Sequence, residues 1–232
     1  GLWTFAKKGV EIVGEHEDTN MSGKTTAVHI THEAIGKIGG IGAVLEGLFT
    51  SRSYQNQINR TILISPLFSR EGDVSTRLGE GGEVLYSSAD GRTPANYAAT
   101  FRHIENAFNV GIVYGRRTFA DSRSGVKSAP EVILLDITRM DAGPINEFKA
   151  RLFNEFGIRS NLYEHLWEFE QYVRIAPVAI AVLKAIGAAD HDGTTILVAH
   201  EFMGMPTALA GILDPYDFRT VFYAHEVAPM RQ

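Results

Sequence analysis

Short runs of apolar residues alternate along the chain with longer stretches whose apolar positions recur at helical spacing. The short runs are nearly continuous in Val, Ile and Leu, which is typical of strands buried on both faces of a parallel sheet. They predict seven strands, over residues 26–31, 60–65, 83–87, 110–114, 131–137, 194–199 and 219–224. Helices are expected between many of them, over residues 42–54, 94–108, 144–156, 163–186 and 203–213.

This alternation predicts an α/β fold, a Rossmann-like doubly wound domain with a mainly parallel sheet and helices on both faces. Residues 1–23 are expected to form an irregular lead-in, and residues 24–232 a single domain, because neither an internal repeat nor a linker interrupts them. Residues 73–87 contain closely spaced glycines between two short extended runs, which predicts a hairpin insertion. Residues 121–130 are polar and predict a loop.

The turn after the first predicted strand carries the clearest chemical signal. Residues 37–42 read KIGGIG and lead into a predicted helix. Glycines let the backbone approach an anion, the helix start offers unpaired N–H groups, and Lys37 adds a full positive charge. The turn does not match the dinucleotide fingerprint, because Leu45 stands where its third glycine would fall. A tight strand-to-helix connection without a ligand is the alternative interpretation.

Histidines and arginines follow several other predicted strands, at the edge of the sheet where doubly wound folds bind ligands. His-Glu pairs occur at residues 32–33, 200–201 and 225–226, but none has the second histidine that a zinc-peptidase helix requires four positions later. A histidine in such a place serves either function or packing. The arginines at 116 and 117 are expected to be a solvated pair.

Composition excludes several classes of function. The 232-residue chain carries a formal net charge of −5, so it lacks the basic face that general nucleic-acid binding needs. It contains no cysteine, which excludes disulfides, thiolate nucleophiles and cysteine metal sites. Its most apolar helical stretch, residues 175–189, contains Lys184 and is too short to cross a bilayer. We therefore expect a cytoplasmic protein that binds neither nucleic acid nor membrane.

Four separated segments resemble signature motifs of glycogen and starch synthases. Residues 37–42 resemble the lysine–x–glycine–glycine–leucine–glycine turn of that family, and residues 164–169 (EHLWEF) its aspartate–asparagine–x–x–arginine–phenylalanine helix start. Residues 195–202 (TILVAHEF) are similar to the strand that ends in histidine–aspartate–tryptophan. Residues 220–225 (TVFYAH) are similar to the threonine–valine–phenylalanine–threonine–isoleucine–histidine strand that follows it. The order and approximate spacing of the four segments agree over residues 26–228.

The resemblance implies the N-terminal, acceptor-side domain of a two-domain (GT-B) retaining glycosyltransferase. Such enzymes move glucose from a nucleoside-diphosphate sugar, here ADP- or UDP-glucose, to a glucan-type acceptor without a metal or other cofactor. The implied catalytic residues are Lys37, Glu164 and His200. Lys37, Gly39 and Gly40 would bind the donor diphosphate, and His200, Glu201 and His225 would line the cleft for the sugar and acceptor. The C-terminal nucleotide-binding domain is the expected partner, and without it the chain is expected to be inactive.

Three other functions stay open at this stage. A non-catalytic glycan- or sugar-phosphate-binding module on the same fold would bind a ligand without turnover. A nucleotide-dependent oxidoreductase or epimerase is disfavoured by the missing third glycine. A purely structural domain would bind none of these ligands, so Lys37→Ala would leave every titration unchanged.

Overall fold

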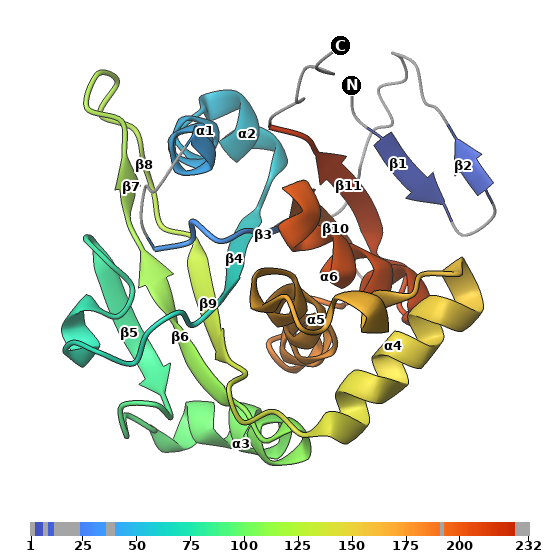
Figure 1. Cartoon of the computed structure of the whole chain (residues 1–232). Helices are drawn as coiled ribbons and strands as arrows, with labels where there is room; N and C mark the ends of the chain where they lie inside the picture. Colours follow the sequence, from blue (N-terminus) through green and yellow to red (C-terminus); the bar gives the residue numbers. More distant parts are fainter. Residues whose placement is uncertain (1–2, 7–8, 12–23, 36–39, 191–192, 226–232) are drawn as a thin grey trace, which may run out of the picture.

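The computed structural model describes residues 3–6, 9–11, 24–35, 40–190 and 193–225 (Figure 1). In these residues nine strands form one sheet in the order β2-β1-β11-β10-β3-β4-β9-β6-β5. Their bounds are β1 (Trp3–Ala6), β2 (Gly9–Glu11), β3 (Lys24–Ile30), β4 (Arg60–Pro66), β5 (Gly82–Ser87), β6 (Gly111–Arg117), β9 (Glu131–Asp136), β10 (Gly193–His200) and β11 (Arg219–Tyr223). A separate two-stranded ribbon joins β7 (Phe119–Ala120) to β8 (Lys127–Ser128).

The centre of the sheet is parallel. Strands β11, β10, β3, β4 and β9 pair parallel to one another, whereas β6 and β5 continue the sheet antiparallel on one side and β1 and β2 on the other. All seven strands predicted from the apolar runs are confirmed within a few residues at each end. The runs form strands because both faces of the sheet are covered, so that Ile62, Leu63 and Ile64 of β4 are all fully buried.

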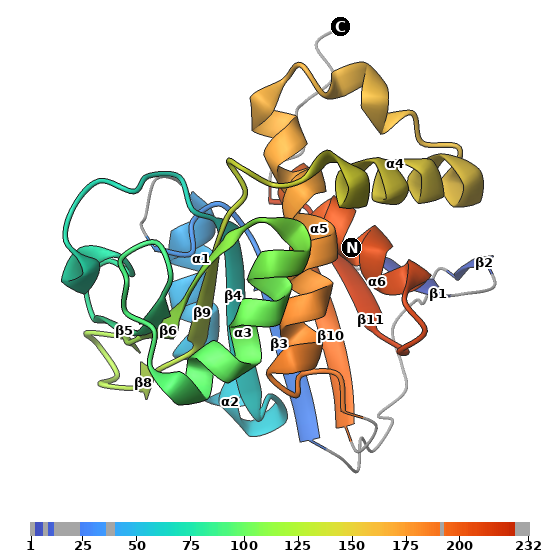
Figure 2. The ribbon, with the colours of Figure 1, turned by 90° about the horizontal axis from the view of Figure 1, so that it is seen from below.

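Helices cover both faces, as expected for an α/β fold. The helices are α1 (Gly40–Phe49), α2 (Arg52–Gln57), α3 (Ala95–Phe108), α4 (Ala142–Phe156), α5 (Trp167–Ala185) and α6 (Glu201–Leu213), with short 3-10 turns η1 (Val74–Thr76) and η2 (Ser160–Tyr163). Figure 2 shows α3 and α5 in front of the sheet with α1 and α2 behind it. Helix α6 packs beside α5 on the same face, and α4 packs on α5.

Two predicted helices have different bounds. The helix expected over residues 42–54 is two helices, α1 and α2, because Ser51 adopts an extended backbone (ψ 128°) and begins the second one. The helix expected from residue 163 begins at Trp167, and the residues before it form η2. Helix α5 continues through Pro177.

The hairpin predicted over residues 73–87 is wrong. Gly79 and Gly81 do turn the chain, both with φ 73°, but the residues before them form η1, capped by Asp73, instead of a strand. Strand β5 therefore pairs with β6.

The predicted lead-in and loop also contain strands. Strands β1 and β2 pair antiparallel within residues 1–23, and β1 also pairs with β11; residues 1–2, 7–8 and 12–23 lie outside the described part of the chain. Within residues 121–130, Lys127–Ser128 form β8, and the rest of the segment is turn or irregular, as expected for a loop.

Candidate functional site

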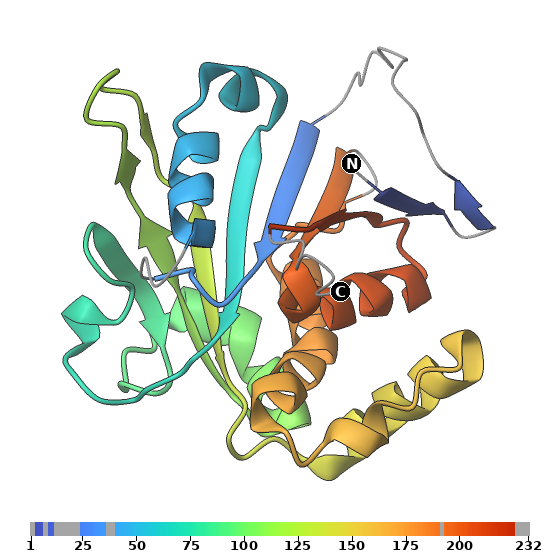
Figure 3. The same cartoon turned by 45° about the horizontal axis from the view of Figure 1, so that its top comes forward.

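The direction of chain travel across the sheet reverses between β3 and β10. From β3 the chain crosses through α1 to β4 on one side, and from β10 it crosses through α6 to β11 on the other. Figure 3 shows β3 and β10 side by side, with α1 and α6 to either side of them. Because the two crossovers diverge, their helix starts leave a crevice at the carboxyl ends of β3 and β10, where doubly wound sheets bind ligands.

A cavity of about 680 Å³ lies in this crevice. We call it the switch-point cavity. Residues from the end of β3 and the start of α1 line one side, and residues from α6 and the segment after β11 line the other. The lining residues are His32, Glu33, Gly40, Ile41, Glu201, Phe202, Met203 and His225.

The start of α1 already carries a carboxylate of the protein itself. Glu33 is buried, and its Oε2 accepts a hydrogen bond from the backbone N–H of Gly42 at 2.6 Å. Its Oε1 lies 3.3 Å from Nε2 of His32. The first-turn amides of a helix have no intrahelical acceptor, and Glu33 serves one of them. An anionic ligand at this helix start would therefore meet a negative charge as well as amides.

A row of hydrogen bonds runs from the other side of the cavity into the interior. Nε2 of His225 lies 2.6 Å from Nδ1 of His200, and Nε2 of His200 lies 2.9 Å from Nδ1 of His29. Nε2 of His29 lies 3.0 Å from the hydroxyl of Tyr54, which lies 3.0 Å from Oγ1 of Thr61. We call these five residues the histidine chain. They come from β3, α2, β4, β10 and the segment after β11, so only the assembled sheet brings them together.

Burial keeps the three histidines of the histidine chain, His29, His200 and His225, neutral. Burial lowers the pKa of His200 to about 3, with the neighbouring His225 as a second cause. The pKa of His29 is held well below its usual value by burial and then by His200. The pKa of His225 is lowered by burial, which outweighs the opposing effect of Glu201 and Glu33. Desolvation disfavours the charged imidazolium in each case.

Glu201 occupies the sharp turn from β10 into α6. Its φ of 55° is in the left-handed region, where non-glycine residues are strained. Its carboxylate Oε1 accepts a hydrogen bond from the backbone N–H of His225. Glu201 therefore ties the segment after β11 to the start of α6, and His225 is held at the cavity by a backbone contact.

The structure brings four of the seven residues predicted for the site to the switch-point cavity or its wall. Gly40, Glu201 and His225 line it, and His200 is fully buried directly behind His225. Lys37 and Gly39 lie outside the described residues.

Glu164 lies elsewhere. It follows η2, its side chain is 58% exposed, and its carboxylate accepts a hydrogen bond from Lys149 of α4 at 3.1 Å. It is not among the residues that line the cavity.

Sequence reasoning missed His29 and Tyr54 altogether. His29 is hidden inside an apolar run, and nothing in local spacing says that this one polar residue meets a histidine 171 positions away. Tyr54 is the last residue of a predicted helix, and its sequence neighbours give no sign of a polar role. Glu33 was visible as part of a His-Glu pair, but its role as an acceptor for Gly42 was not.

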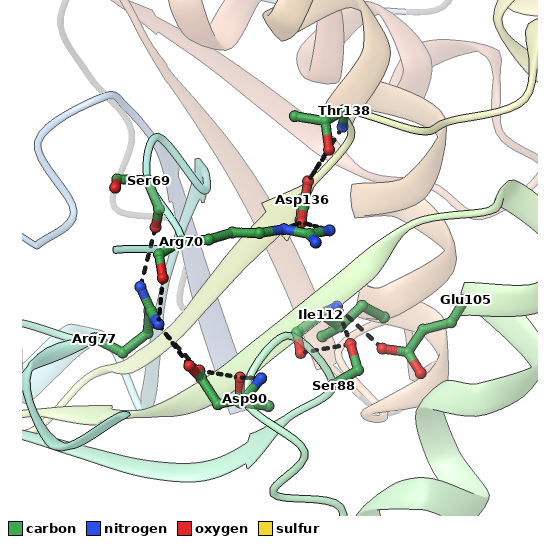
Figure 4. Close-up of polar contacts among 10 residues, drawn as sticks. Ser69, Arg70, Arg77, Ser88, Asp90, Glu105, Ile112, Asp136 and Thr138 are labelled. Atoms are coloured by element: carbon green, nitrogen blue, oxygen red, sulfur yellow. Dashed lines mark hydrogen bonds and ion pairs between the residues drawn. The ribbon is translucent and has the colours of Figure 1, made fainter. Parts of the chain in front are cut away.

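A second polar cluster lies at the same edge of the sheet, beside the ends of β5 and β9 (Figure 4). Arg77 is almost fully buried; it donates to Asp90 at 2.5 Å and to the carbonyls of residues 69–72. Arg70 in turn pairs with the buried carboxylate of Asp136, which also accepts from Thr138. We call these five residues the Arg77 cluster.

The arginines at 116 and 117 differ from each other. Arg116 is exposed, as expected. Arg117 is not a solvated residue: it donates to the carbonyls of Ala34 and Glu80 at 3.0 and 3.3 Å, and its guanidinium lies over the ring of Phe119. Arg117 therefore holds the segment after β3 against the far end of β6.

Among the described residues, no three His, Asp or Glu side chains are grouped so as to hold a metal ion. Within the same residues, no helix combines the length and apolar character needed to cross a bilayer. A scan against protein-family models found no match, and neither did a search of the curated proteins.

Proposed function

We propose that this chain is the acceptor-side half of a retaining glycosyltransferase of the glycogen- and starch-synthase type. One observation carries the proposal. Three of the four segments that resemble the family, residues 37–42, 195–202 and 220–225, contribute lining residues to a single cavity. The cavity lies at the carboxyl ends of β3 and β10, where this class of fold binds its ligands.

The lining of the switch-point cavity suits a sugar. Glu33 and Glu201 supply carboxylate oxygens that accept hydrogen bonds from hydroxyl groups. Phe202 of α6 is 51% exposed, so its ring offers an apolar face for the C–H groups of a sugar. His225 adds a ring nitrogen to the same lining. Such a mixture of polar groups and an aromatic side chain is typical of sites that fix the orientation of a small ligand.

The start of α1 suits the donor diphosphate. Gly40 is exposed, and a Cβ built on it would meet nothing within 4 Å, so a ligand can approach the backbone there. The helix dipole and the first-turn amides other than that of Gly42, which donates to Glu33, favour negative charge. Lys37 would neutralise the charge that develops on the leaving diphosphate in the transition state. The described residues supply no role for Glu164 in this chemistry, since its carboxylate pairs with Lys149.

The proposal includes a second, nucleotide-binding domain that closes the cleft, as in GT-B enzymes, and a cytoplasmic location. The donor is ADP- or UDP-glucose and the acceptor a glucan. The reaction needs no metal or other cofactor, because the charge of the diphosphate is met by Lys37, the helix start and groups of the second domain.

A non-catalytic glycan- or sugar-phosphate-binding module is the second candidate. The observation that favours it is the burial of His200, both of whose ring nitrogens are already used within the protein. A binding module would hold the same sugar in the same cavity and would not transfer it.

Titration with ADP-glucose, UDP-glucose and inorganic pyrophosphate, followed by amide NMR shifts, tests the site. We expect shifts at Gly40, Ile41 and His225. Lys37→Ala should weaken donor binding about 10- to 100-fold, because a hydrogen bond to a charged group contributes about 1.5–3 kcal/mol. The matched control is Lys24→Ala, an exposed lysine at the opposite end of β3, which should change nothing. Equal effects of both variants, or shifts away from the cavity, would contradict the proposal.

Transfer of labelled glucose to a glucan separates the two candidates. Binding without transfer by the chain alone agrees with both. Transfer when a C-terminal glycosyltransferase domain is supplied supports the enzyme, and its absence in that mixture supports the binding module.

A further inference from the structure

Every ring nitrogen in the buried part of the histidine chain has a partner. His200 contacts His225 through Nδ1 and His29 through Nε2, and His29 contacts His200 through Nδ1 and Tyr54 through Nε2. His29 and His200 are almost completely buried. Water therefore does not supply alternative partners for these rings, and the hydrogen bonds along the chain depend on one another.

A neutral imidazole has one N–H donor and one acceptor nitrogen. If His200 donates through Nε2, then His29 must accept through Nδ1 and donate to Tyr54 through Nε2, and His225 must donate through Nε2. If His200 donates through Nδ1, each of these roles is reversed. All contacts are satisfied only when the three histidines share one tautomer, either all Nε2–H or all Nδ1–H. A mixed arrangement leaves two protons or two lone pairs facing each other in the interior.

We propose that Tyr54 and Thr61 are positioning residues that set, through His29 and His200, which tautomer His225 presents at the switch-point cavity. In the all-Nδ1–H arrangement His225 offers an N–H donor through its outer nitrogen, which suits a phosphate or carbonyl oxygen. In the all-Nε2–H arrangement the same nitrogen is an acceptor, which suits a sugar hydroxyl. Tyr54 and Thr61, at the buried end of the histidine chain, thus decide whether His225 donates or accepts a hydrogen bond at the site. This proposal goes beyond the glycosyltransferase assignment and holds whichever ligand the cavity takes.

The hydroxyl proton of Tyr54 can point toward either of two acceptors. The hydroxyl donates either to Thr61 Oγ1, 3.0 Å away, or to Nε2 of His29, also 3.0 Å away. Donation to Thr61 leaves the tyrosine oxygen as the acceptor for His29 and selects the all-Nε2–H arrangement. Donation to His29 selects the all-Nδ1–H arrangement. Burial raises the pKa of Tyr54 to about 12, which keeps its proton in place at neutral pH.

Long-range ¹H–¹⁵N NMR of the labelled protein at pH 7 reads the tautomer of each histidine without any ligand. We expect His29, His200 and His225 to share one tautomer in the unmodified chain. Thr61→Val removes the acceptor for Tyr54 and keeps the shape of the side chain, so in this variant all three histidines should be Nδ1–H, whichever tautomer the unmodified protein has. Thr61→Ser, which restores the hydroxyl, should restore the original pattern.

The control is the double variant Tyr54→Phe/Thr61→Val. Without the tyrosine hydroxyl, adding Thr61→Val to Tyr54→Phe should leave the His225 tautomer unchanged. Mixed tautomers in the unmodified chain overturn the proposal. So does Thr61→Val with His225 in the Nε2–H form, when amide spectra show that the fold is intact. Since no sugar nucleotide enters the experiment, its result is independent of the titration that tests the glycosyltransferase.

Discussion

The two polar groups at the carboxyl edge of the sheet differ in where their hydrogen bonds end. In the Arg77 cluster, the guanidinium of Arg77 donates hydrogen bonds to Asp90 and to four backbone carbonyls, all within the protein. In the histidine chain, the buried rings are satisfied but the outer member, His225, lines a cavity. The first arrangement fixes a loop, and the second connects the interior to a place where a ligand fits. A dense polar network therefore indicates a functional site only where one of its members faces a cavity, as His225 does.

The largest effect is expected from breaking the Arg77 cluster. Arg77→Met removes the ion pair to Asp90 and the donor to the carbonyls of residues 69–72 in a buried setting, which should lower the free energy of unfolding by about 3–5 kcal/mol. Urea denaturation measures it. The exposed Arg139, changed to Met, is the control and should alter stability by no more than about 0.5 kcal/mol. If Arg77→Met unfolds at the same urea concentration as the unmodified chain, the cluster is not a structural one.

The pH dependence of stability should distinguish the histidine chain from the Arg77 cluster. His29 and His200 have pKa values lowered by burial, so below about pH 6.5 the unfolded chain binds protons that the folded chain does not. Stability should fall with decreasing pH by up to about 1.4 kcal/mol per histidine for each pH unit.

Asp90 behaves differently, because Arg77 lowers its pKa. Its contribution is present above its unfolded pKa and is lost only at lower pH, as the folded carboxyl takes up a proton. Urea denaturation from pH 7 to pH 4 checks this. In Arg77→Met, the part of the pH dependence of stability that comes from His29 and His200 should be unchanged. A flat profile between pH 6.5 and 4.5 would contradict neutral buried histidines.

The two helices whose first residues line the switch-point cavity, α1 and α6, should respond unequally to a single added methyl group. A Cβ on Gly204 of α6 would lie 2.4 Å from the Cα of Ala199 in β10, so Gly204→Ala should destabilise the protein by about 1–3 kcal/mol. A Cβ on Gly47 of α1 meets nothing within 4 Å, so Gly47→Ala should stabilise it by about 0.5–1 kcal/mol. Thermal melts of the two variants give the comparison. Equal shifts would show that α6 is not held against β10 as closely as described.

The smallest effect is expected from the carboxylate at the start of α1. Glu33→Gln keeps an acceptor for Gly42 and removes one negative charge beside the proposed diphosphate site. Pyrophosphate should bind about fivefold more tightly, since one charge a few ångströms away in water contributes about 1 kcal/mol. Glu155→Gln on the exposed face of α4 is the control. Unchanged affinity in Glu33→Gln would place the anion away from this helix start.

The sequence predicts the sheet well because strand formation here depends on local runs of apolar residues. It also predicts that His200 and His225 lie near each other, because strand ends can be read along the chain and these residues lie at the ends of the neighbouring strands β10 and β11. It does not predict the histidine chain, since His29, His200 and Tyr54 meet only through the strand order β10-β3-β4. The hairpin expected over residues 73–87 fails for a similar reason: the glycines specify a turn but not which strand β5 pairs with.

The left-handed backbone of Glu201 lowers the stability of the protein, whereas the side chain of Glu201 holds part of the proposed site. Glycine would adopt φ 55° without strain, and Glu201→Gly would relieve about 1–3 kcal/mol of conformational energy. The same change would delete the carboxylate that anchors the backbone of His225. Any effort to raise the heat resistance of this protein by swapping strained residues for glycine would loosen the very wall on which its chemistry is proposed to depend.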